Sequence, residues 1–364
     1  MIARMEERFM AEALELAARG RGSVSPNPMV GAVLVKGGRV VGRGWHSRFG
    51  GPHAEVVAQR DAGREARDAT LYVTMEPCCF HGKTPACTDG VVTAGIRRVV
   101  AATLDPNPRV NGQGVRFLRR HGVDVSVGLL GSQARRLNEA YITYVKQRRP
   151  LVLLKVACTL DGMIADSTGE SRWITGPAAR RYGQELRMGA DAIVVGFGTV
   201  LADNPRLTCR ISRTKRLLRV VLDSDLRTPP SCLLFSVPGP VLVFASDSDA
   251  RRARRLQKRG AEVVRARRTR AGLLVWTDVM VELYRRQCMS VLIEGGATVA
   301  SSALDAGIVD KVFAFHAPLV LGPGRGFSAR MVPRALGRAI RLKDVTHSCL
   351  GPDILTEGYV HRAG

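Results

Sequence analysis

Hydrophobic and polar residues alternate along the first part of the chain in a pattern that predicts a sheet covered by helices. Residues 9–20 combine strong helix formers with helical spacing, and helices are also predicted near residues 53–58 and 88–94. Gly37-Gly38 separates two apolar runs and predicts a hairpin turn. The predicted strands are short apolar runs at residues 30–35, 40–41, 71–75, 99–102 and 123–127. This order of elements favours a layered α/β domain.

A second alternation of strands and helices begins after residues 146–150, where charged residues and a proline interrupt the pattern. A helix is predicted over residues 177–187. The predicted strands of this part lie at residues 151–157, 192–196, 220–222, 241–245, 291–293 and 312–315. We therefore predict two α/β domains, at residues 1–147 and 148–364.

The composition is that of a globular protein. Of the 364 residues, 45% are hydrophobic and 24% are charged, which argues against disorder and against a fibrous repeat. No apolar run approaches the roughly 18 residues that a membrane span needs, and the N-terminal residues lack the apolar stretch of a secretory signal. Eight irregularly spaced cysteines favour metal ligands or buried thiols over a disulfide scaffold. We expect a cytoplasmic protein without a membrane partner.

The net charge of +23, from 55 Lys and Arg against 32 Asp and Glu, is unusual. It favours anionic partners, namely nucleic acid, a phosphorylated metabolite or a phosphate-rich cofactor, whereas a solvated arginine-rich surface is the alternative. Residues 251–259 are compatible with a helix capped by Ser246 or Asp247, and arginines recur at residues 265–270. For both segments a solvated helix face is a simpler interpretation than an RNA contact.

The most distinctive local chemistry lies at His53, Glu55, Cys78 and Cys87. One imidazole and two thiolates suit Zn²⁺ and leave its fourth position for water, whose pKa falls to about 7 there. Glu55 stands two residues from His53 near a helix start, where it can shuttle a proton without binding the metal. Zinc deaminases share a His-x-Glu and Pro-Cys signature of this kind, and a purely structural zinc site is the alternative.

The spacing of the two cysteines departs from that of nucleic-acid-editing deaminases. Eight residues separate Cys78 from Cys87, where the editing enzymes have two. Cys79 is an alternative ligand. We favour Cys87, because its position at a predicted helix start stabilises a thiolate.

Longer motifs in both halves of the chain resemble a known family. The loop TMEPCCFHGKTPAC, with SPNPMVGAVLV before it and DPNPRVNGQG after it, is similar to the zinc region of the RibD family, the bifunctional deaminase/reductases of riboflavin biosynthesis. KVACTLDGMIA, GESRWITG, GFGTVLADNPRLTCR and LIEGGAT resemble the second half of the same family. The resemblance spans nearly the whole chain. It implies a cytidine-deaminase-like three-layer domain followed by a dihydrofolate-reductase-like domain.

For the first domain the resemblance implies zinc-dependent hydrolytic deamination of 2,5-diamino-6-(5-phosphoribosylamino)pyrimidin-4(3H)-one. One zinc ion per chain would be held by His53, Cys78 and Cys87, with Glu55 as the catalytic acid and base. The residues that match the family's substrate contacts are Asn27, His46, Lys83, Asp105 and Asn107. Taken alone, the two asparagines are also typical of proline-flanked turns, and the lysine of a solvated loop.

The zinc loop also differs from the family. Phe80 stands where family members commonly carry a histidine, and His81 follows one position later. A phenylalanine cannot donate a hydrogen bond to the substrate, although it can stack on a pyrimidine. This difference concerns substrate contacts rather than the zinc chemistry.

For the second domain the resemblance implies NADPH-dependent reduction of the ribosyl side chain to ribityl, giving 5-amino-6-(5-phosphoribitylamino)uracil. The residues that match cofactor contacts are Ala157, Trp173, Thr199, Asp203, Ser224, Gly296, Ala297, Thr298, Val299, Ala300, Ser301 and Ser302. Those that match substrate contacts are Ser171, Arg187, Leu207, Arg210 and Glu294. Guanidinium groups and a Gly-Gly turn before a helix both suit phosphates. Asp203 either helps to deliver a proton or orients the cofactor, and Trp173 taken alone is typical of a core residue.

Two other functions are weighed against this one. A nucleic-acid-binding or editing deaminase with a basic C-terminal domain would use the positive charge, but the cysteine spacing and the reductase motifs oppose it. An active deaminase with an idle reductase domain is the second alternative. The family leads us to expect a homo-oligomer, either a dimer or a tetramer.

Overall fold

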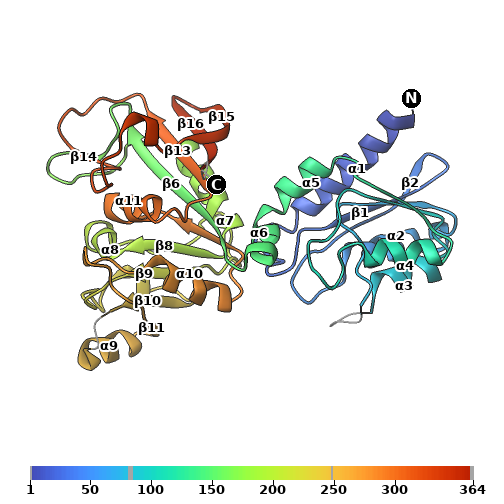
Figure 1. The fold of residues 1–364 in the computed structure, drawn as a ribbon, viewed down its shortest axis with the longest axis horizontal. Helices are drawn as coiled ribbons and strands as arrows, with labels where there is room; N and C mark the ends of the chain where they lie inside the picture. Colours follow the sequence, from blue (N-terminus) through green and yellow to red (C-terminus); the bar gives the residue numbers. More distant parts are fainter. Residues whose placement is uncertain (1, 81–84, 247–248, 361–364) are drawn as a thin grey trace. The chain divides into compact units, whose positions relative to one another are not determined.

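The computed structural model describes residues 2–80, 85–246 and 249–360. The chain divides into two compact units, Met1–Arg148 and Arg149–Gly364, which are drawn in Figure 1. Each unit contains a sheet of its own. Within the described ranges, every helix is too short or too polar to cross a membrane.

The first unit is built on a mixed sheet. Its strands lie in the order β2 (Arg39–Trp45), β1 (Gly31–Lys36), β3 (Thr70–Val73), β4 (Arg98–Ala101) and β5 (Asp124–Val127). β1 pairs antiparallel with β2 and β3, whereas β3, β4 and β5 run parallel. The helices are α1 (Ile2–Ala18), α2 (Ala54–Ala62), α3 (Cys87–Thr93), α4 (Gln113–Arg120), α5 (Gly131–Leu137) and α6 (Glu139–Gln147), with a 3₁₀ turn at Gly63–Ala66.

Helices cover both faces of this sheet and make three layers. Successive residues of a strand face opposite sides, so Val33 and Val35 of β1 pack with α1 and α5. Ala32 and Leu34 face the other side, where they pack with α2, α3 and α4. This burial on both faces explains why β1 is a continuous apolar run rather than an alternating one.

The second unit has a larger sheet with parallel strands over most of its width. The strand order is β11 (Ala261–Arg265), β10 (Val241–Ala245), β9 (Leu218–Leu222), β8 (Ala192–Gly196), β12 (Ser290–Ile293), β6 (Leu151–Thr159), β13 (Lys311–Ala317), β16 (Asp353–Val360) and β15 (Leu342–Leu350). The strands from β11 to β13 are parallel, and β16 and β15 continue the sheet antiparallel. A small separate sheet pairs β7 (Met163–Ala165) with β14 (Arg325–Gly326).

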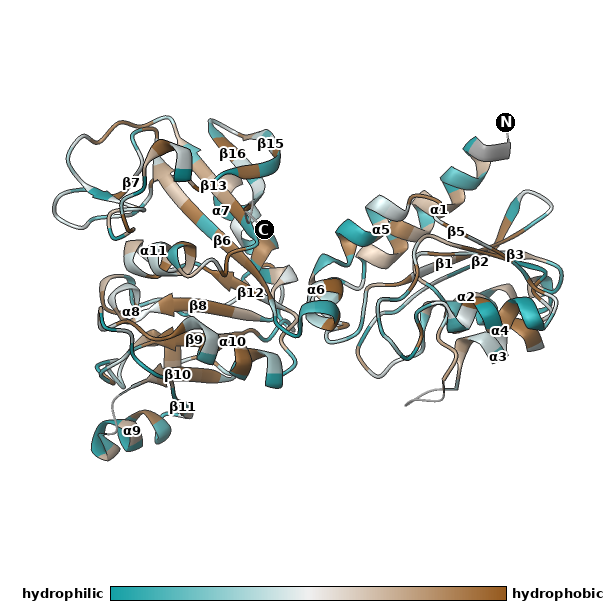
Figure 2. Cartoon of the chain, in the orientation of Figure 1, coloured by the Kyte–Doolittle hydropathy of each residue, from teal (hydrophilic) through white to brown (hydrophobic). Residues whose placement is uncertain are grey.

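Helices also flank this second sheet. They are α7 (Pro177–Gly189), α8 (Phe197–Asp203), α9 (Ala250–Gln257), α10 (Trp276–Arg285) and α11 (Ala297–Asp305), with 3₁₀ turns at Leu233–Phe235 and Leu336–Arg338. In β8, Val194 packs on the side of α10 and α11, and Ile193 and Val195 pack on the side of α7 and α9. The hydrophobic colour of β8, β9 and β10 in Figure 2 reflects this burial on both faces.

The structure confirms some local predictions and corrects one. Gly37 and Gly38 have φ of +55° and +77°, the left-handed conformation that a tight hairpin turn requires. The predicted N-cap of α9 is wrong, because Asp249 is the N-cap residue. Its carboxylate accepts hydrogen bonds from the backbone N–H groups of Arg251 and Arg252. Ser246 instead donates to the carbonyl of Ser224, and residue 247 lies outside the described ranges.

Candidate active sites

Two helix N-termini of the first unit bring the candidate zinc ligands together. His53 is the N-cap residue of α2, and Glu55 stands in the first turn of that helix. Cys87 is the first residue of α3, and Cys78 lies in the segment that follows β3. The positive end of a helix dipole stabilises a thiolate. The location of Cys87 therefore agrees with its expected role as a ligand.

Glycines in β2 allow α2 to lie close to the sheet. A Cβ atom at Gly44 would stand 2.2 Å from the carbonyl oxygen of Ala54, and one at Gly42 would stand 2.4 Å from that of Ala58. A larger residue at either position would push α2 away from β2. Close packing therefore fixes where the first turn of α2 presents its side chains.

The three ligand atoms have the separations of a zinc site. His53 Nδ1 lies 3.2 Å from Cys87 Sγ and 3.6 Å from Cys78 Sγ, and all three atoms lie within 4.8 Å of one another. Tetrahedral bonds of about 2.3 Å to sulfur and 2.1 Å to nitrogen separate such atoms by roughly 3.6 Å. These residues fit zinc. Cys79 points elsewhere, because its thiol is directed at the carbonyl of Arg109, 3.9 Å away.

The protonation states around the cluster suit metal binding and proton transfer. A hydrogen bond from Cys87 lowers the pKa of the Cys78 thiol to about 4, and the backbone N–H of Cys87 also donates to that sulfur at 3.5 Å. Burial raises the pKa of the Glu55 carboxyl to about 7. A carboxyl group with a pKa in this range can both accept and release a proton at neutral pH.

A cleft of about 290 Å³ opens beside this cluster. The predicted residues that line it are Asn27, His46, His53, Glu55, Cys78, Asp105 and Asn107. Cys87 is buried next to them. Lys83 and His81 lie outside the described residues.

Hydrogen bonds orient the polar side of this cleft. His46 Nδ1 lies 2.9 Å from the carbonyl oxygen of Pro52, which only accepts, so Nδ1 carries the proton. His46 Nε2 then accepts from the amide nitrogen of Asn27, 3.1 Å away. Burial lowers the pKa of His46 and keeps the ring neutral near pH 7. This arrangement leaves the carbonyl oxygen of the Asn27 amide as an acceptor.

Two polar residues that line this cleft, Tyr141 and Glu76, were not predicted from the sequence. Tyr141 of α6 donates to Asp105 Oδ1 at 3.0 Å, and burial raises the pKa of Asp105 to about 6. The buried carboxylate of Glu76 accepts three hydrogen bonds of 2.8–3.2 Å, from the backbone N–H groups of Asp105, Gly112 and Val115. Glu76 directly precedes Pro77-Cys78. This position beside a candidate zinc ligand is the only feature of the local sequence that could have indicated Glu76.

Phe80, where the resemblance leads us to expect a histidine, lines this cleft. The guanidinium group of Arg109 lies 4.4 Å from the centre of that ring. Arg109 is exposed and follows the loop that carries Asp105 and Asn107. The phenylalanine therefore places a cation near the cleft, where a histidine would place a hydrogen-bonding group.

A second cleft, of about 910 Å³, lies at the carboxyl ends of β6, β8, β9 and β12. Ligands commonly bind at this edge of a parallel sheet. The predicted residues that line the cleft are Ala157, Ser171, Thr199, Asp203, Ser224, Glu294, Gly296, Ala297, Thr298, Val299, Ala300 and Ser302. Lys155, Asp225 and Arg227, which were not predicted from the sequence, also line it.

The turn before α11 has the form of a phosphate site. A Cβ atom at Gly295 would stand 2.7 Å from the Val299 side chain, so the close turn requires a glycine. The backbone N–H of Gly296 donates to Thr199 Oγ1 at 3.0 Å. The N-terminal residues of α11 line the cleft, and helix N-termini favour phosphate groups. The donor set fits the pyrophosphate of a dinucleotide.

Two of the predicted substrate residues, Arg187 and Glu294, form an ion pair whose side chains are 17% and 12% exposed. Arg187 binds Glu294 through two hydrogen bonds, of 2.9 and 2.7 Å, and also donates to the carbonyl of Thr208. Burial alone would raise the pKa of Glu294, but the charges of Arg187, Lys155 and Arg210 lower it overall. Glu294 and Lys155 line the cleft, whereas Arg187 lies behind Glu294. Some of the N–H donors of the Arg187 guanidinium are thus already used within the protein, in hydrogen bonds to Glu294 and Thr208.

Other predicted residues of this domain are not among those that line the cleft. They are Trp173, Arg187, Leu207, Arg210 and Ser301. Trp173 is 63% exposed, and Arg180 lies over its ring, so the interpretation of this tryptophan as a core residue is wrong. Ser171 Oγ donates to Asp203 Oδ1 at 3.5 Å. This contact joins a predicted substrate residue to a predicted cofactor residue.

Comparisons with known proteins assign each half of the chain to a family. Residues 3–103 match the family described as the cytidine and deoxycytidylate deaminase zinc-binding region, and residues 150–356 match the RibD C-terminal domain. The riboflavin biosynthesis protein RibD of Aquifex aeolicus is 38% identical, with 98% of each chain covered. The protein of the same name from Escherichia coli is 40% identical, over 96% of this chain and 98% of its own length.

Solved structures extend the likeness to the fold. A diaminohydroxyphosphoribosylaminopyrimidine deaminase/5-amino-6-(5-phosphoribosylamino)uracil reductase from Thermotoga maritima is 39% identical, with a TM-score of 0.89 over 99% of this chain and 100% of its own. RibD of Acinetobacter baumannii is 34% identical, with a TM-score of 0.90 at the same coverage. The α/β units are thus a cytidine-deaminase-like domain and a RibD reductase domain. The chain belongs to the RibD family, the bifunctional deaminase and reductase enzymes of riboflavin biosynthesis.

Proposed function

We propose that the chain catalyses two successive reactions on one phosphorylated pyrimidine. The first is hydrolytic deamination of 2,5-diamino-6-(5-phosphoribosylamino)pyrimidin-4(3H)-one, which takes up water and releases ammonia. The second is NADPH-dependent reduction of the ribosyl group, which yields 5-amino-6-(5-phosphoribitylamino)uracil. The grouping of His53, Cys78, Cys87 and Glu55 beside one cleft supports the first reaction most directly.

In the deaminase site, each residue would have a separate task. His53, Cys78 and Cys87 would hold zinc, which supplies a water molecule with a pKa of about 7. Glu55 lines the cleft in the first turn of α2 and would take the proton from the attacking water. It would then return that proton to the departing amine.

The polar wall of the same cleft would orient the pyrimidine. Asn27 offers an amide carbonyl, because its nitrogen is already bound to His46. Asp105 and Asn107 stand on a short loop in which the backbone N–H of Asn107 donates to Asp105 at 2.8 Å. These groups suit ring edges and ribose hydroxyls. A phosphate contact by Lys83 stays a prediction, as does the contact made by Phe80.

In the reductase site, NADPH supplies the hydride. Backbone N–H groups at the start of α11 would bind its pyrophosphate, with Thr199 holding the turn in place. Glu294 and Lys155, which face the same cleft, would lie on the substrate side together with Ser171 and Asp203. The cytoplasmic location and the homo-oligomeric state stay predictions.

A substitution of the proposed acid–base residue tests this assignment. Glu55→Gln should lower the rate of ammonia release by about a hundredfold or more, because the amide cannot transfer the proton. Zinc content, measured by atomic emission, should stay near one ion per chain, and reduction of the deaminated substrate by NADPH should be unchanged. An active Glu55→Gln enzyme would contradict the proposed role.

A further inference from the structure

Tyr141 is a buried tyrosine that reaches the deaminase cleft from α6, the last helix of the first unit. Its side chain lines the cleft, and the residue is only 7% exposed. The hydroxyl donates to Asp105 Oδ1 at 3.0 Å. Burial and the adjacent Asp105 carboxylate raise the pKa of Tyr141, so the hydroxyl stays protonated and acts as a donor. Tyr141 therefore connects α6 to a loop that carries proposed substrate contacts.

The two carboxylate oxygens of Asp105 differ in what they bind. Oδ1 accepts hydrogen bonds from the Tyr141 hydroxyl and, at 2.8 Å, from the backbone N–H of Asn107. Two hydrogen bonds fill the lone pairs of one carboxylate oxygen. Oδ2 accepts no hydrogen bond from a residue of the described ranges. Because Asp105 lines the cleft, Oδ2 is the oxygen that stays available to a ligand.

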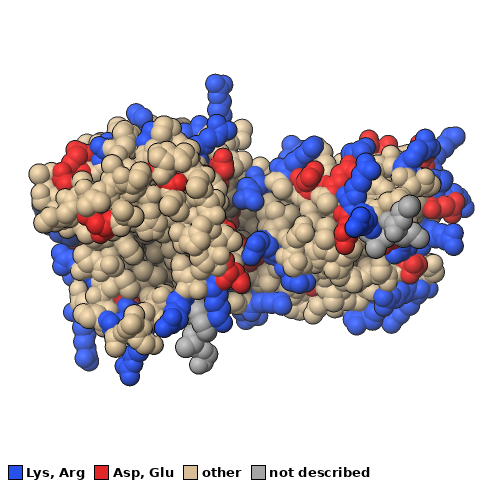
Figure 3. Space-filling model, turned by 90° about the horizontal axis from the view of Figure 1, so that it is seen from above, with Lys and Arg blue, Asp and Glu red and all other residues tan. Residues whose placement is uncertain are grey.

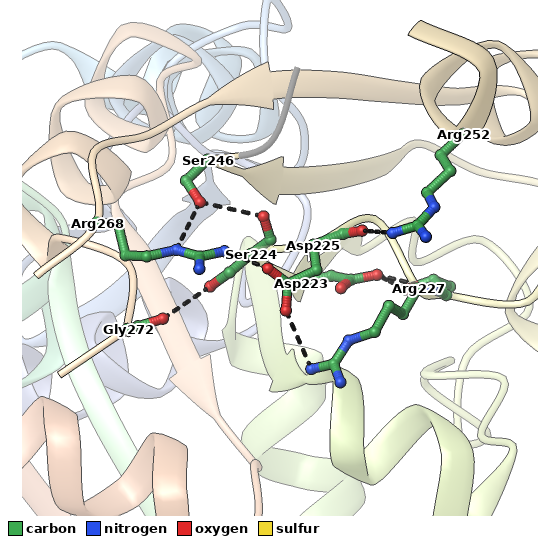
Figure 4. A network of polar contacts seen from close by, with 9 residues as sticks. Asp223, Ser224, Asp225, Arg227, Ser246, Arg252, Arg268 and Gly272 are labelled. Carbon is green, nitrogen blue, oxygen red and sulfur yellow. Dashed lines mark hydrogen bonds and ion pairs between the residues drawn. The ribbon is translucent and has the colours of Figure 1, made fainter. Parts of the chain in front are cut away.

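The partners of Asp105 also differ in charge from those of the carboxylate shown in Figure 4. There Asp225, at the other cleft, contacts the guanidinium groups of Arg268 and Arg227, so cations balance its charge. The donors to Asp105 Oδ1 are a neutral hydroxyl and a backbone N–H. Neutral donors orient the carboxylate and leave its negative charge to strengthen a hydrogen bond from a ligand. Asp105 is thus suited to bind an N–H or O–H group of the substrate.

The helix that carries Tyr141 is itself anchored to the wall of the cleft. Asn138 is the buried N-cap residue of α6, and its side chain binds the backbone of Met29. Asn138 Oδ1 accepts from the Met29 N–H, and Asn138 Nδ2 donates to the Met29 carbonyl, both at 2.8 Å. Met29 stands two residues after Asn27, which lines the cleft. Through these contacts, α6 links the segment of Asn27 to the loop of Asp105.

We propose that Tyr141 is a positioning residue for substrate binding in the deaminase site. Its hydroxyl fixes Asp105 so that Oδ2 accepts a hydrogen bond from an N–H or O–H group of the phosphorylated pyrimidine. Tyr141 acts through Asp105 and takes no part in the proton transfer proposed for Glu55. This inference rests on the proposed deaminase function and adds to it a residue that sets substrate affinity.

The kinetics of ammonia release by Tyr141→Phe test this role, because the substitution removes only the hydroxyl group. KM for the phosphoribosylaminopyrimidine substrate should rise roughly tenfold, which corresponds to the loss of a hydrogen bond to a charged group. The value of kcat should stay within about twofold, because Glu55 and the zinc ligands lie on other elements than α6. Tyr144→Phe is the matched control. It removes a hydroxyl from the same helix outside the lining of the cleft, and its KM should equal that of the unmodified chain.

A double-mutant cycle distinguishes action through Asp105 from a general effect on the fold. Asp105→Ala alone should lower kcat/KM, because the acceptor for the substrate is lost. Adding Tyr141→Phe to Asp105→Ala should change kcat/KM by less than about twofold, since the hydroxyl then has no carboxylate to hold.

Three results would overturn the role of Tyr141. They are an unchanged KM in Tyr141→Phe, a fall in its kcat without a rise in KM, and effects of the two substitutions that multiply in the double variant. Each of these presupposes that the unmodified, zinc-loaded chain releases ammonia from the substrate. No release by the unmodified chain would instead overturn the proposed deaminase function.

Discussion

Three carboxylates that are little exposed to solvent differ in their hydrogen-bond partners, and these partners suit them to different tasks. Glu55 is buried with the zinc ligands and faces the cleft, where a proton can be exchanged. Glu76 is also buried, but backbone N–H groups surround it. Glu294 is held by two hydrogen bonds from Arg187. The same side chain therefore acts as a candidate acid, a loop support or a charge partner.

Glu76 supports the loop that carries Asp105, and its substitution should show this. Glu76→Gln places an amide NH₂ against backbone donors, which should cost about 1–3 kcal/mol of the free energy of unfolding. Scanning calorimetry would measure the loss, and ammonia release should fall because Asp105 is displaced. Glu15→Gln, at an exposed position of α1, is the control and should be neutral. Unchanged stability of Glu76→Gln would contradict the supporting role.

At the scale of elements, the deaminase site depends on how closely α2 approaches β2. Gly42 and Gly44 leave room for the carbonyl oxygens of α2, and the first turn of that helix carries Glu55 after the N-cap His53. In the second domain, glycines play a similar part in the turn before α11. In both places the absence of a side chain on one element sets the position of functional groups on another.

Gly44→Ala should therefore lower deaminase activity, although Gly44 does not line the cleft. The new Cβ would lie 2.2 Å from a backbone oxygen, so α2 must move, at a cost of about 1–3 kcal/mol in stability. Displacement of Glu55 by about 1 Å should lower deamination by roughly a hundredfold. Gly183→Ala is the matched control, because a Cβ at that position in α7 meets nothing within 4 Å. Full zinc content and full deamination in Gly44→Ala would contradict this prediction, because the site would then tolerate the movement of α2.

The accuracy of the sequence predictions followed the strength of the local pattern. The apolar runs at residues 192–196 and 241–245 coincide with β8 and β10, because both faces of these strands are buried. β15 has an almost entirely exposed, polar sequence and gave no such signal, although it pairs with β16. The helices α4, α5, α6, α8 and α10 were also missed.

Functional residues were predictable where they lie inside a motif. His53 and Cys78 stand in local signatures, and their cleft brings them together with Asp105. Tyr141 and Glu76 contact Asp105 from positions 36 and 29 residues away along the chain. Such contacts depend on tertiary packing, which a short sequence motif does not reveal.

At the scale of the whole molecule, the positive charge is not gathered into a single stripe on the face that Figure 3 shows. Lys and Arg side chains are spread over the visible face of each unit, with acidic side chains among them (Figure 3). Nucleic acid binding, which the net charge of +23 first suggested, is not favoured once the family is known. The phosphate groups of the proposed substrate and cofactor would give local uses for some arginines, and nothing in the structure explains the rest.

The two clefts draw their described lining residues from different units, so their activities should separate. Removal of zinc by dialysis against a chelator should abolish deamination, because the metal holds the reacting water. Reduction of 5-amino-6-(5-phosphoribosylamino)uracil by NADPH should continue, and added zinc should restore deamination. Parallel loss of both activities would show that the reductase also depends on the metal.

Mass spectrometry of the phosphoribosylaminopyrimidine substrate tests the central claim most directly. The zinc-loaded protein should exchange one amine for a carbonyl oxygen without any cofactor. The further gain of two hydrogens should appear only when NADPH is present. Gain of hydrogen before loss of the amine would contradict the order of the two reactions, and an unchanged substrate under both conditions would contradict the proposed activity.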